Sequence, residues 1–222
     1  MLPGPDDFLV MPLFAHLDEA ARSHLAAHAR FRRFAKGSLV FQEAGSPDFI
    51  YVVISGKVRL FQTLADGREY TLEHLGPHET LGSASVFDGG PYPASAETLA
   101  PTLLMEIPLA AMTSLLHERP EVAVSFLRLF AQRMRRAHAR TTDMALRTVH
   151  ERLASIILQL WEDQDRHGSL HVSALQLAQL VGAARETITR ALHDLQRQGA
   201  LRLGRGKIDI ADEGKLYLWI QR

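Results

Sequence analysis

The hydrophobic pattern of the chain changes from strand-like to helical near residue 108, and this change limits the possible folds more than any other feature. Residues 31–108 hold short β-branched and aromatic runs separated by turn signals such as Asp66-Gly67. From residue 109 onward, apolar residues recur at the spacings of three and four that amphipathic helices require. A strand-rich part followed by a helical part predicts an α+β protein.

The strand-rich part has the marks of an antiparallel roll. The runs "VRLFQTL" and "REYTLEHL" flank Asp66-Gly67, which is a strong hairpin signal. Many short strands at such spacing predict a barrel or jelly roll. A helix over residues 14–30, with Asp18 as its N-cap, is expected to precede the roll. We assign residues 1–118 to this N-terminal domain.

A long helix is expected next, over residues 119–147, beginning near Pro120. It has one narrow apolar stripe with arginines on both sides, as in a coiled coil. A stripe this long favours an interface between two copies of the chain, although a core helix packed on the roll would show a similar pattern. The stripe consists of Leu127, Phe130, Met134, Ala137, Thr141 and Met144.

Residues 148–222 contain the pattern of a helix-turn-helix followed by a hairpin. Ser173 can cap a short helix, Gly182 supplies the freedom needed for a turn, and Gly199 ends a second helix. The strands of the hairpin surround Gly204-Arg205-Gly206, which predicts a basic wing. The short helix is expected to direct four side chains inward: Leu175, Leu177, Ala178 and Leu180.

The second helix carries long polar side chains at its amino end, off its apolar stripe. Arg185 and Arg190 can each bond a guanine edge in a bidentate fork, and Glu186 can accept from cytosine. This favours reading of bases in the major groove, whereas a solvated surface helix is the plainer alternative. Further residues are expected to contact phosphate: Ser173, Thr187, Thr189, Arg205 and Lys207.

Composition excludes several classes of site. The chain has a net charge of zero, but residues 173–222 carry eight Lys or Arg against five Asp or Glu, a balance of +3. That asymmetry is compatible with double-stranded DNA as a partner. With no cysteine there can be no disulfide, thiolate-held iron–sulfur cluster or cysteine nucleophile. No apolar run reaches the ~20 residues that span a bilayer, so we expect a cytoplasmic protein without membrane contact.

From about residue 8 to its end, the chain resembles the CRP/FNR family of bacterial transcription regulators. The likeness rests on "LVGAARETITRALHDLQRQGAL" and "FRRFAKGSLVFQEAGSPDFIYVVISGKVRLF". Arg185, Glu186 and Arg190 stand where the three base-reading residues of the family stand. The resemblance implies a homodimer with a cyclic-nucleotide-binding-like roll, a dimerisation helix and a winged helix. It also implies a palindromic promoter site and RNA polymerase as a further partner.

The segment that would bind an effector departs from the cyclic-AMP-binding members of the family. Those members carry Gly-Glu-Leu and then Arg-Ser/Thr-Ala, in which the Glu holds the ribose and the Arg pairs with the cyclic phosphate. Here Ser83 follows Gly82, and no arginine lies between Arg68 and Arg119. Cyclic AMP is therefore not the expected effector. The candidate pocket residues are Gly82, Ser83, Ala94 and Ser95.

Other effectors and other functions stay open at this point. Haem would need a ligand from the roll, and the candidates are His16, His24, His28, His74 and His78. A regulator without any effector is equally allowed, as is a winged helix that binds protein. A cupin-like metal enzyme is disfavoured because His74 and His78 do not face one site in strand or loop geometry. No nucleophile elbow, P-loop or HExxH motif is present, so the chain is not expected to be an enzyme.

Overall fold

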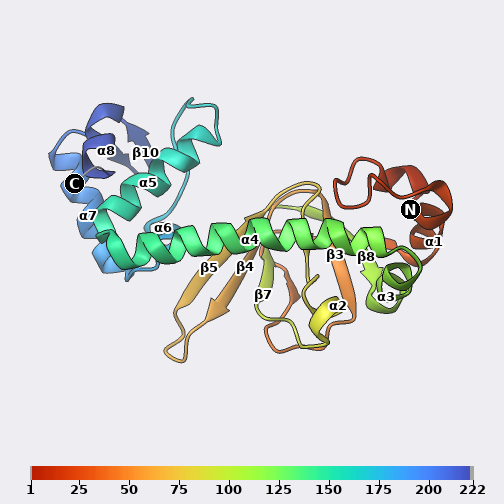
Figure 1. The fold of residues 1–222 in the computed structure, drawn as a ribbon. Coiled ribbons are helices and arrows are strands. Elements are labelled where there is room, and N and C mark those ends of the chain that lie inside the picture. The colour runs from red at the N-terminus through yellow and green to blue at the C-terminus, as the bar shows by residue number, and fades with distance from the viewer. Residues whose placement is uncertain (1, 221–222) are drawn as a thin grey trace. The chain divides into compact units, whose positions relative to one another are not determined.

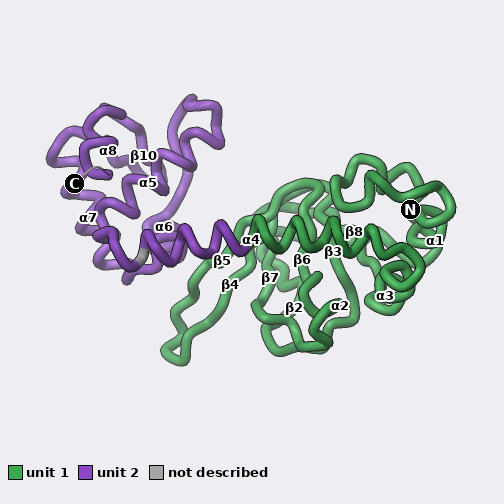
Figure 2. Tube along the Cα trace, viewed as in Figure 1, with its two compact units in different colours: residues 1–133 green, residues 134–222 purple. Residues whose placement is uncertain are grey.

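A computed structural model describes residues 2–220, without the side chain of Met144. The chain forms two compact units, Met1–Arg133 and Met134–Arg222, coloured separately in Figure 2. The division falls within the long helix α4 (Pro120–Leu146). The expected helix over 119–147 is therefore confirmed to within a residue, while the three-domain division stays a prediction.

The first unit is built on two four-stranded sheets (Figure 1). One has the strand order β1-β8-β3-β6, the other β2-β7-β4-β5, and the pairings within both are antiparallel. This confirms the expected antiparallel roll. The strands are β1 (Arg30–Phe34), β2 (Leu39–Phe41), β3 (Phe49–Ser55), β4 (Val58–Thr63), β5 (Glu69–Leu75), β6 (Thr80–Leu81), β7 (Ser95–Thr98) and β8 (Thr102–Pro108).

Alternation along the central strands separates two apolar cores. In β3, Tyr51 and Val53 join a cluster that also takes Val58 and Ala96 from the other sheet, so this core lies between the sheets. The alternate residue Val52 joins a second cluster with helical residues such as Phe126. The first sheet is therefore buried on both faces.

Short helices complete the first unit. The helix expected over residues 14–30 is shorter, α1 (Glu19–His28), but it begins at the expected cap. Asp18 caps α1 by accepting a hydrogen bond from the Ala21 backbone N–H at 2.8 Å. The β4–β5 hairpin turns at Gly67, whose φ of 81° is accessible to glycine at little cost. The helices are the 3₁₀ helix η1 (Pro5–Phe8), α1 (Glu19–His28), α2 (Ser85–Asp88), α3 (Leu109–Glu118) and the first half of α4.

The second unit is a helical bundle with one hairpin. Its elements are the last part of α4, α5 (Val149–Glu162), α6 (Ala174–Val181), α7 (Arg185–Arg197), β9 (Leu201–Gly204), β10 (Lys207–Ile210) and α8 (Glu213–Ile220). One core, which includes Leu153, Ile188 and Leu216, joins α5, α7 and α8. Among the described residues, no helix is both long and apolar enough to cross a membrane.

The inward set of α6 needs one correction. Leu177 and Ala178 are buried and Leu180 is half-buried, but Leu175 is 53% exposed. The buried face of α6 runs through Leu177, Ala178 and Val181. Leu175 precedes Leu177 by two residues, which places it about 200° around the helix, facing away from the core.

Candidate nucleic-acid interface

The turn between α6 and α7 depends on a cap and a glycine. Ser173 forms a capping box with Gln176: its hydroxyl accepts from the Gln176 N–H at 3.2 Å, and the Gln176 side chain accepts from the Ser173 N–H at 2.9 Å. Gly182 ends α6 with φ 70° and ψ 49°, a left-handed conformation that few other residues adopt. The chain then enters α7 within three residues, as a helix-turn-helix requires.

Helix α7 buries one face and exposes the expected polar side chains on the other. Its buried residues are Ile188, Ala191, Leu192 and Leu195. The side chains of Arg185, Glu186 and Arg190 are exposed and form no hydrogen bond or ion pair with any other described residue. Two guanidiniums and a carboxylate thus project from the first turns of α7 without a partner in the part of the chain that the structure describes.

Two of the three hydroxyls expected to contact phosphate, those of Ser173 and Thr189, already donate within the fold. The Thr189 hydroxyl donates to the Arg185 carbonyl at 2.9 Å, and that of Ser173 donates to Gln176 Oε1 at 3.0 Å. Thr187 is half-buried. Each hydroxyl oxygen can still accept, but donation to a phosphate would require Ser173 or Thr189 to give up its internal bond.

The hairpin β9–β10 follows α7 directly and is confirmed as a two-stranded ladder. Gly206 in its turn has φ 71°. Arg205, beside it, is exposed and has no partner among the described residues. The ammonium of Lys207 lies 3.6 Å from Asp209 Oδ2, so this lysine is partly neutralised. Arg205 is therefore the freer of the two wing cations.

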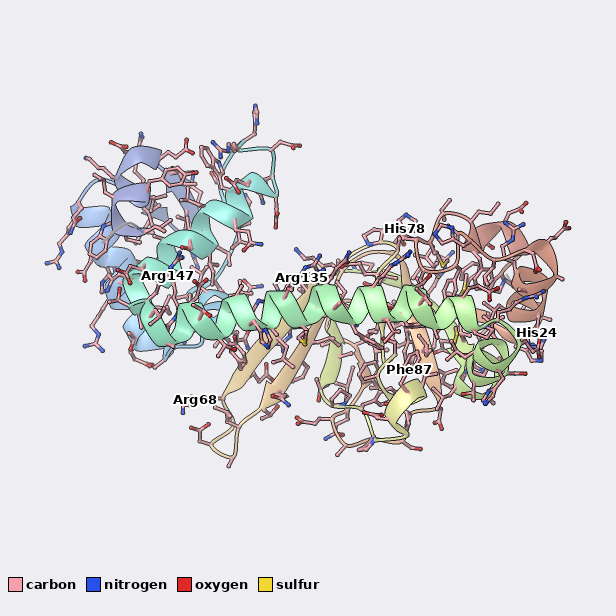
Figure 3. The ribbon with its side chains drawn as sticks, viewed as in Figure 1. His24, Arg68, His78, Phe87, Arg135 and Arg147 are labelled. Atoms are coloured by element: carbon pink, nitrogen blue, oxygen red, sulfur yellow. The ribbon has the colours of Figure 1, made fainter. Side chains whose placement is uncertain are left out.

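The stripe of α4 expected to join two copies is largely exposed in the single chain. Leu127 is 63% exposed and Met134 is 56% exposed, and Ala137 and Thr141 are exposed as well. The side chain of Met144 lies outside the described part. Phe130 differs, because its ring packs edge-on against Phe87 of α2 (labelled in Figure 3), with 5.4 Å between ring centroids. Phe130 therefore also contributes to the packing of its own unit.

Three of the four candidate effector-pocket residues, Ser83, Ala94 and Ser95, are buried. The fourth, Gly82, lies against a tyrosine ring. A methyl group added at Gly82 would lie only 2.9 Å from Cε1 of Tyr92. The Ser95 hydroxyl is used, since it accepts from the Glu43 N–H at 3.0 Å.

Tyr92 itself is firmly held and was not expected from the sequence. It is 2% exposed, and its ring stacks on Phe41 with 4.0 Å between centroids. Its hydroxyl donates to the Phe49 carbonyl at 2.8 Å. Burial raises the pKa of Tyr92, so this hydroxyl stays protonated as a donor. The sequence signal was present in the pair of prolines around it, Pro91 and Pro93, which restrict the backbone there.

The structure does not bring the candidate haem and metal ligands together. His24 and His28 lie one turn apart on α1 with their rings tilted by 41°, while His78 lies in an exposed turn elsewhere in the same unit (Figure 3). His16 is exposed and His74 lies on β5. Across the described ranges, no group of three or more His, Asp or Glu side chains is placed to hold a metal ion.

Two protein-family descriptions match the chain. Residues 31–119 match the cyclic nucleotide-binding domain, and residues 151–218 match the Crp-like helix-turn-helix domain. The first covers the two sheets, and the second covers α5 to α8. Together the two matches span most of both compact units.

The chain is also similar over nearly its whole length to characterised regulators. It is 33% identical over 213 residues to the CRP-like cAMP-activated global transcriptional regulator of Mycobacterium tuberculosis, covering 92% of this chain and 94% of that one. It is 32% identical over 205 residues to the cyclic AMP receptor protein of Thermus thermophilus, with the same two coverages. A solved structure from Eubacterium rectale, described as a regulator of the crp/fnr family, superposes with a TM-score of 0.86 at 23% identity, covering 96% and 99% of the two chains.

Proposed function

The chain is a member of the CRP/FNR family of transcription regulators, and we propose that it binds a palindromic promoter site as a homodimer, with Arg185, Glu186 and Arg190 reading bases. The observation that carries this proposal is the state of those three side chains. They are exposed at the start of α7 and have no partner among the described residues. An unpaired guanidinium is ready to form two parallel bonds to guanine O6 and N7.

Contacts to phosphate fix the register of the protein on the duplex. Backbone N–H groups at the start of α7 and the positive end of its dipole favour a phosphate nearby. Arg205 on the wing is free to pair with a second phosphate, and Lys207 could exchange Asp209 for one. The remaining candidate contacts are Ser173, Thr187 and Thr189.

Two copies joined along the exposed stripe of α4 would present two α7 helices to one duplex. Twofold symmetry places such helices in successive major grooves, about 34 Å apart. The DNA site should then be an inverted repeat, with half-sites about one helical turn apart. RNA polymerase is the further partner that a promoter-bound regulator of this family would meet.

Selection of binding sites from a random pool of DNA duplexes tests the proposal. We expect an inverted repeat with G or C at the positions that Arg185, Glu186 and Arg190 face. The logarithm of the affinity for that site should fall linearly with the logarithm of the salt concentration, with a slope of about −0.9 for each phosphate contact. A winged helix that binds protein instead would select no repeat, and its affinity would depend little on salt.

Because the roll matches the cyclic nucleotide-binding domain, we compare the chemistry of the candidate pocket residues with that of a cyclic nucleotide. A cyclic phosphate carries a full negative charge and needs a cation or several N–H donors. Gly82, Ser83, Ala94 and Ser95 supply no cation, and the ring of Tyr92 lies against Gly82. The buried Ser83 hydroxyl makes no hydrogen bond with the described residues. The two neutral hydroxyls of Ser83 and Ser95 do not replace a cation, which supports a roll that does not take cyclic AMP.

Thermal unfolding with and without cyclic AMP checks this prediction. We expect no change in Tm at millimolar nucleotide. The Mycobacterium tuberculosis relative, whose name records activation by cAMP, is the positive control. A ligand at a hundred times its Kd stabilises a protein by about 2.7 kcal/mol, which raises Tm by roughly 5–10 °C at this size. A shift of that order in this chain would contradict the prediction.

A further inference from the structure

Helix α7 carries an acidic residue, Asp194, where it could pair with the proposed base-reading residue Arg190. Asp194 follows Arg190 by four residues, so the two side chains emerge one above the other on the helix surface. A carboxylate there can attract the Arg190 guanidinium. An Arg190 paired with Asp194 would have fewer N–H donors left for a guanine edge.

Both oxygens of Asp194 are already occupied by other cations or donors. His150 Nε2 on α5 lies 3.0 Å from Oδ2, and because an ionised carboxylate only accepts, this nitrogen donates. Arg197 donates to Oδ1 from one turn further along α7. These two contacts, led by the one from His150, lower the pKa of the Asp194 carboxyl below its usual value.

His150 is itself fixed from a third helix. Its ring stacks on that of Trp219 in α8, with 5.0 Å between centroids and 17° between the planes. The side chain of His150 is 31% exposed, as is that of Asp194, so the contact is partly shielded from water. The stacking on Trp219 therefore keeps Nε2 of His150 directed at Asp194, and it involves none of the proposed DNA-contacting residues of α7.

We propose that His150 and Arg197 are positioning residues for DNA recognition, which occupy Asp194 and so leave Arg190 free to read a base. This inference rests on the proposed function, because it assumes that Arg190 is a base reader. It gives α5, through His150, and α8, through Trp219, a part in specificity. The plainer alternative is that the His150–Asp194 contact only holds α7 against α5.

The positioning role and the purely structural role predict different ratios of two affinities. The first affinity is for the matched site, and the second is for the site in which the base pair facing Arg190 is changed. In His150→Ala, Oδ2 of Asp194 becomes available to Arg190. Exposed pairs of this spacing are weak, so we expect the ratio to fall about two- to fivefold over the two half-sites. A loss of packing alone would weaken both sites equally and leave the ratio unchanged.

Removing the carboxylate charge should rescue the defect. In the double variant H150A/D194N the ratio should return to that of the unaltered protein, and Asp194→Asn alone should keep it. His171→Ala is the matched control, because His171 is an exposed histidine of the same unit that has no partner among the described residues. An unchanged ratio in His150→Ala, or a failure of Asp194→Asn to restore it, would overturn the proposal.

Two further variants keep the proposal testable if His150→Ala does not fold or if Arg190 does not read a base. If His150→Ala fails to fold, Arg197→Ala replaces it, since the Arg197 side chain is 79% exposed and its removal frees Oδ1 while the His150 contact remains. The same fall in ratio and the same rescue by Asp194→Asn are then required. Arg190→Ala is measured alongside. If it leaves the ratio unchanged, the base-reading assignment fails first, and that failure is distinguishable from failure of the Asp194 contacts.

Discussion

Replacing Arg190 with alanine should lower affinity for the matched palindromic site by about 1–3 kcal/mol at each half-site. Over two half-sites this is a loss of roughly 30-fold to 10⁴-fold. The reason is that Arg190 is exposed on the first turns of α7 and has no partner within residues 2–220. Titration of the variant against the selected duplex, and against duplexes altered at one base pair, measures both the loss and the position at which specificity relaxes.

Arg205→Ala is the control for that prediction. Arg205 is also an exposed arginine for which the described residues offer no partner, but it lies in the turn of the β9–β10 hairpin. Its removal should weaken binding to all sequences alike and reduce the salt slope by about one unit. If Arg190→Ala likewise weakened matched and scrambled sites equally, Arg190 would be a phosphate contact and its role as a base reader would be wrong.

The helix-turn-helix was predictable because its signals are local. A capping serine, a glycine with φ 70° at the turn and a glycine with φ 72° after α7 each act within a few residues of themselves. Helix α8 carries a cap signal as well, since Asp212 accepts from the Lys215 N–H at 3.1 Å, but its apolar residues run consecutively from Leu216 to Ile220. The sequence did not predict α8, because a consecutive apolar run marks no single helical face; only Leu216 in it is fully buried.

The arrangement of the roll could be predicted only in outline. Turn residues and alternation indicated short antiparallel strands, but β1 pairs with β8 across more than seventy residues, which no local signal encodes. The candidate effector pocket likewise depends on contacts between distant segments, which could not be predicted from local signals. Gly82 and Ser83 were recognised by sequence position, whereas Tyr92 became visible only once the fold placed its ring against Gly82.

The sequence alone could not predict which side chains of the DNA interface are left without a partner within the described protein. Arg190 and Asp194 are one turn apart, and from the sequence they form an ordinary ion pair of helix spacing. The structure shows Asp194 bonded instead to His150, forty-four residues earlier, and to Arg197. A residue's partners depend on tertiary contacts, so only the fold distinguishes an arginine that reads bases from one that stabilises its own helix.

Met134→Glu should convert the proposed dimer to a monomer. Met134 lies on the apolar stripe of α4 and is 56% exposed in the single chain, so it has apolar surface for a second copy to cover. In a twofold seam two glutamates would face each other, and burying two like charges is strongly unfavourable. Sedimentation should give half the mass of the unaltered protein, and affinity for the inverted repeat should fall because each monomer contacts only one half-site.

Phe130→Glu would be a poorer test, because Phe130 packs against Phe87 and Phe126 of its own unit and its replacement would also weaken the fold. The better control is Ala139→Glu, which introduces the same charge on the same helix. Ala139 is exposed and follows Met134 by five residues, about 140° around α4 from the stripe. That variant should stay dimeric and bind DNA normally. A dimer that persists in Met134→Glu would mean that two copies do not meet along this face of α4.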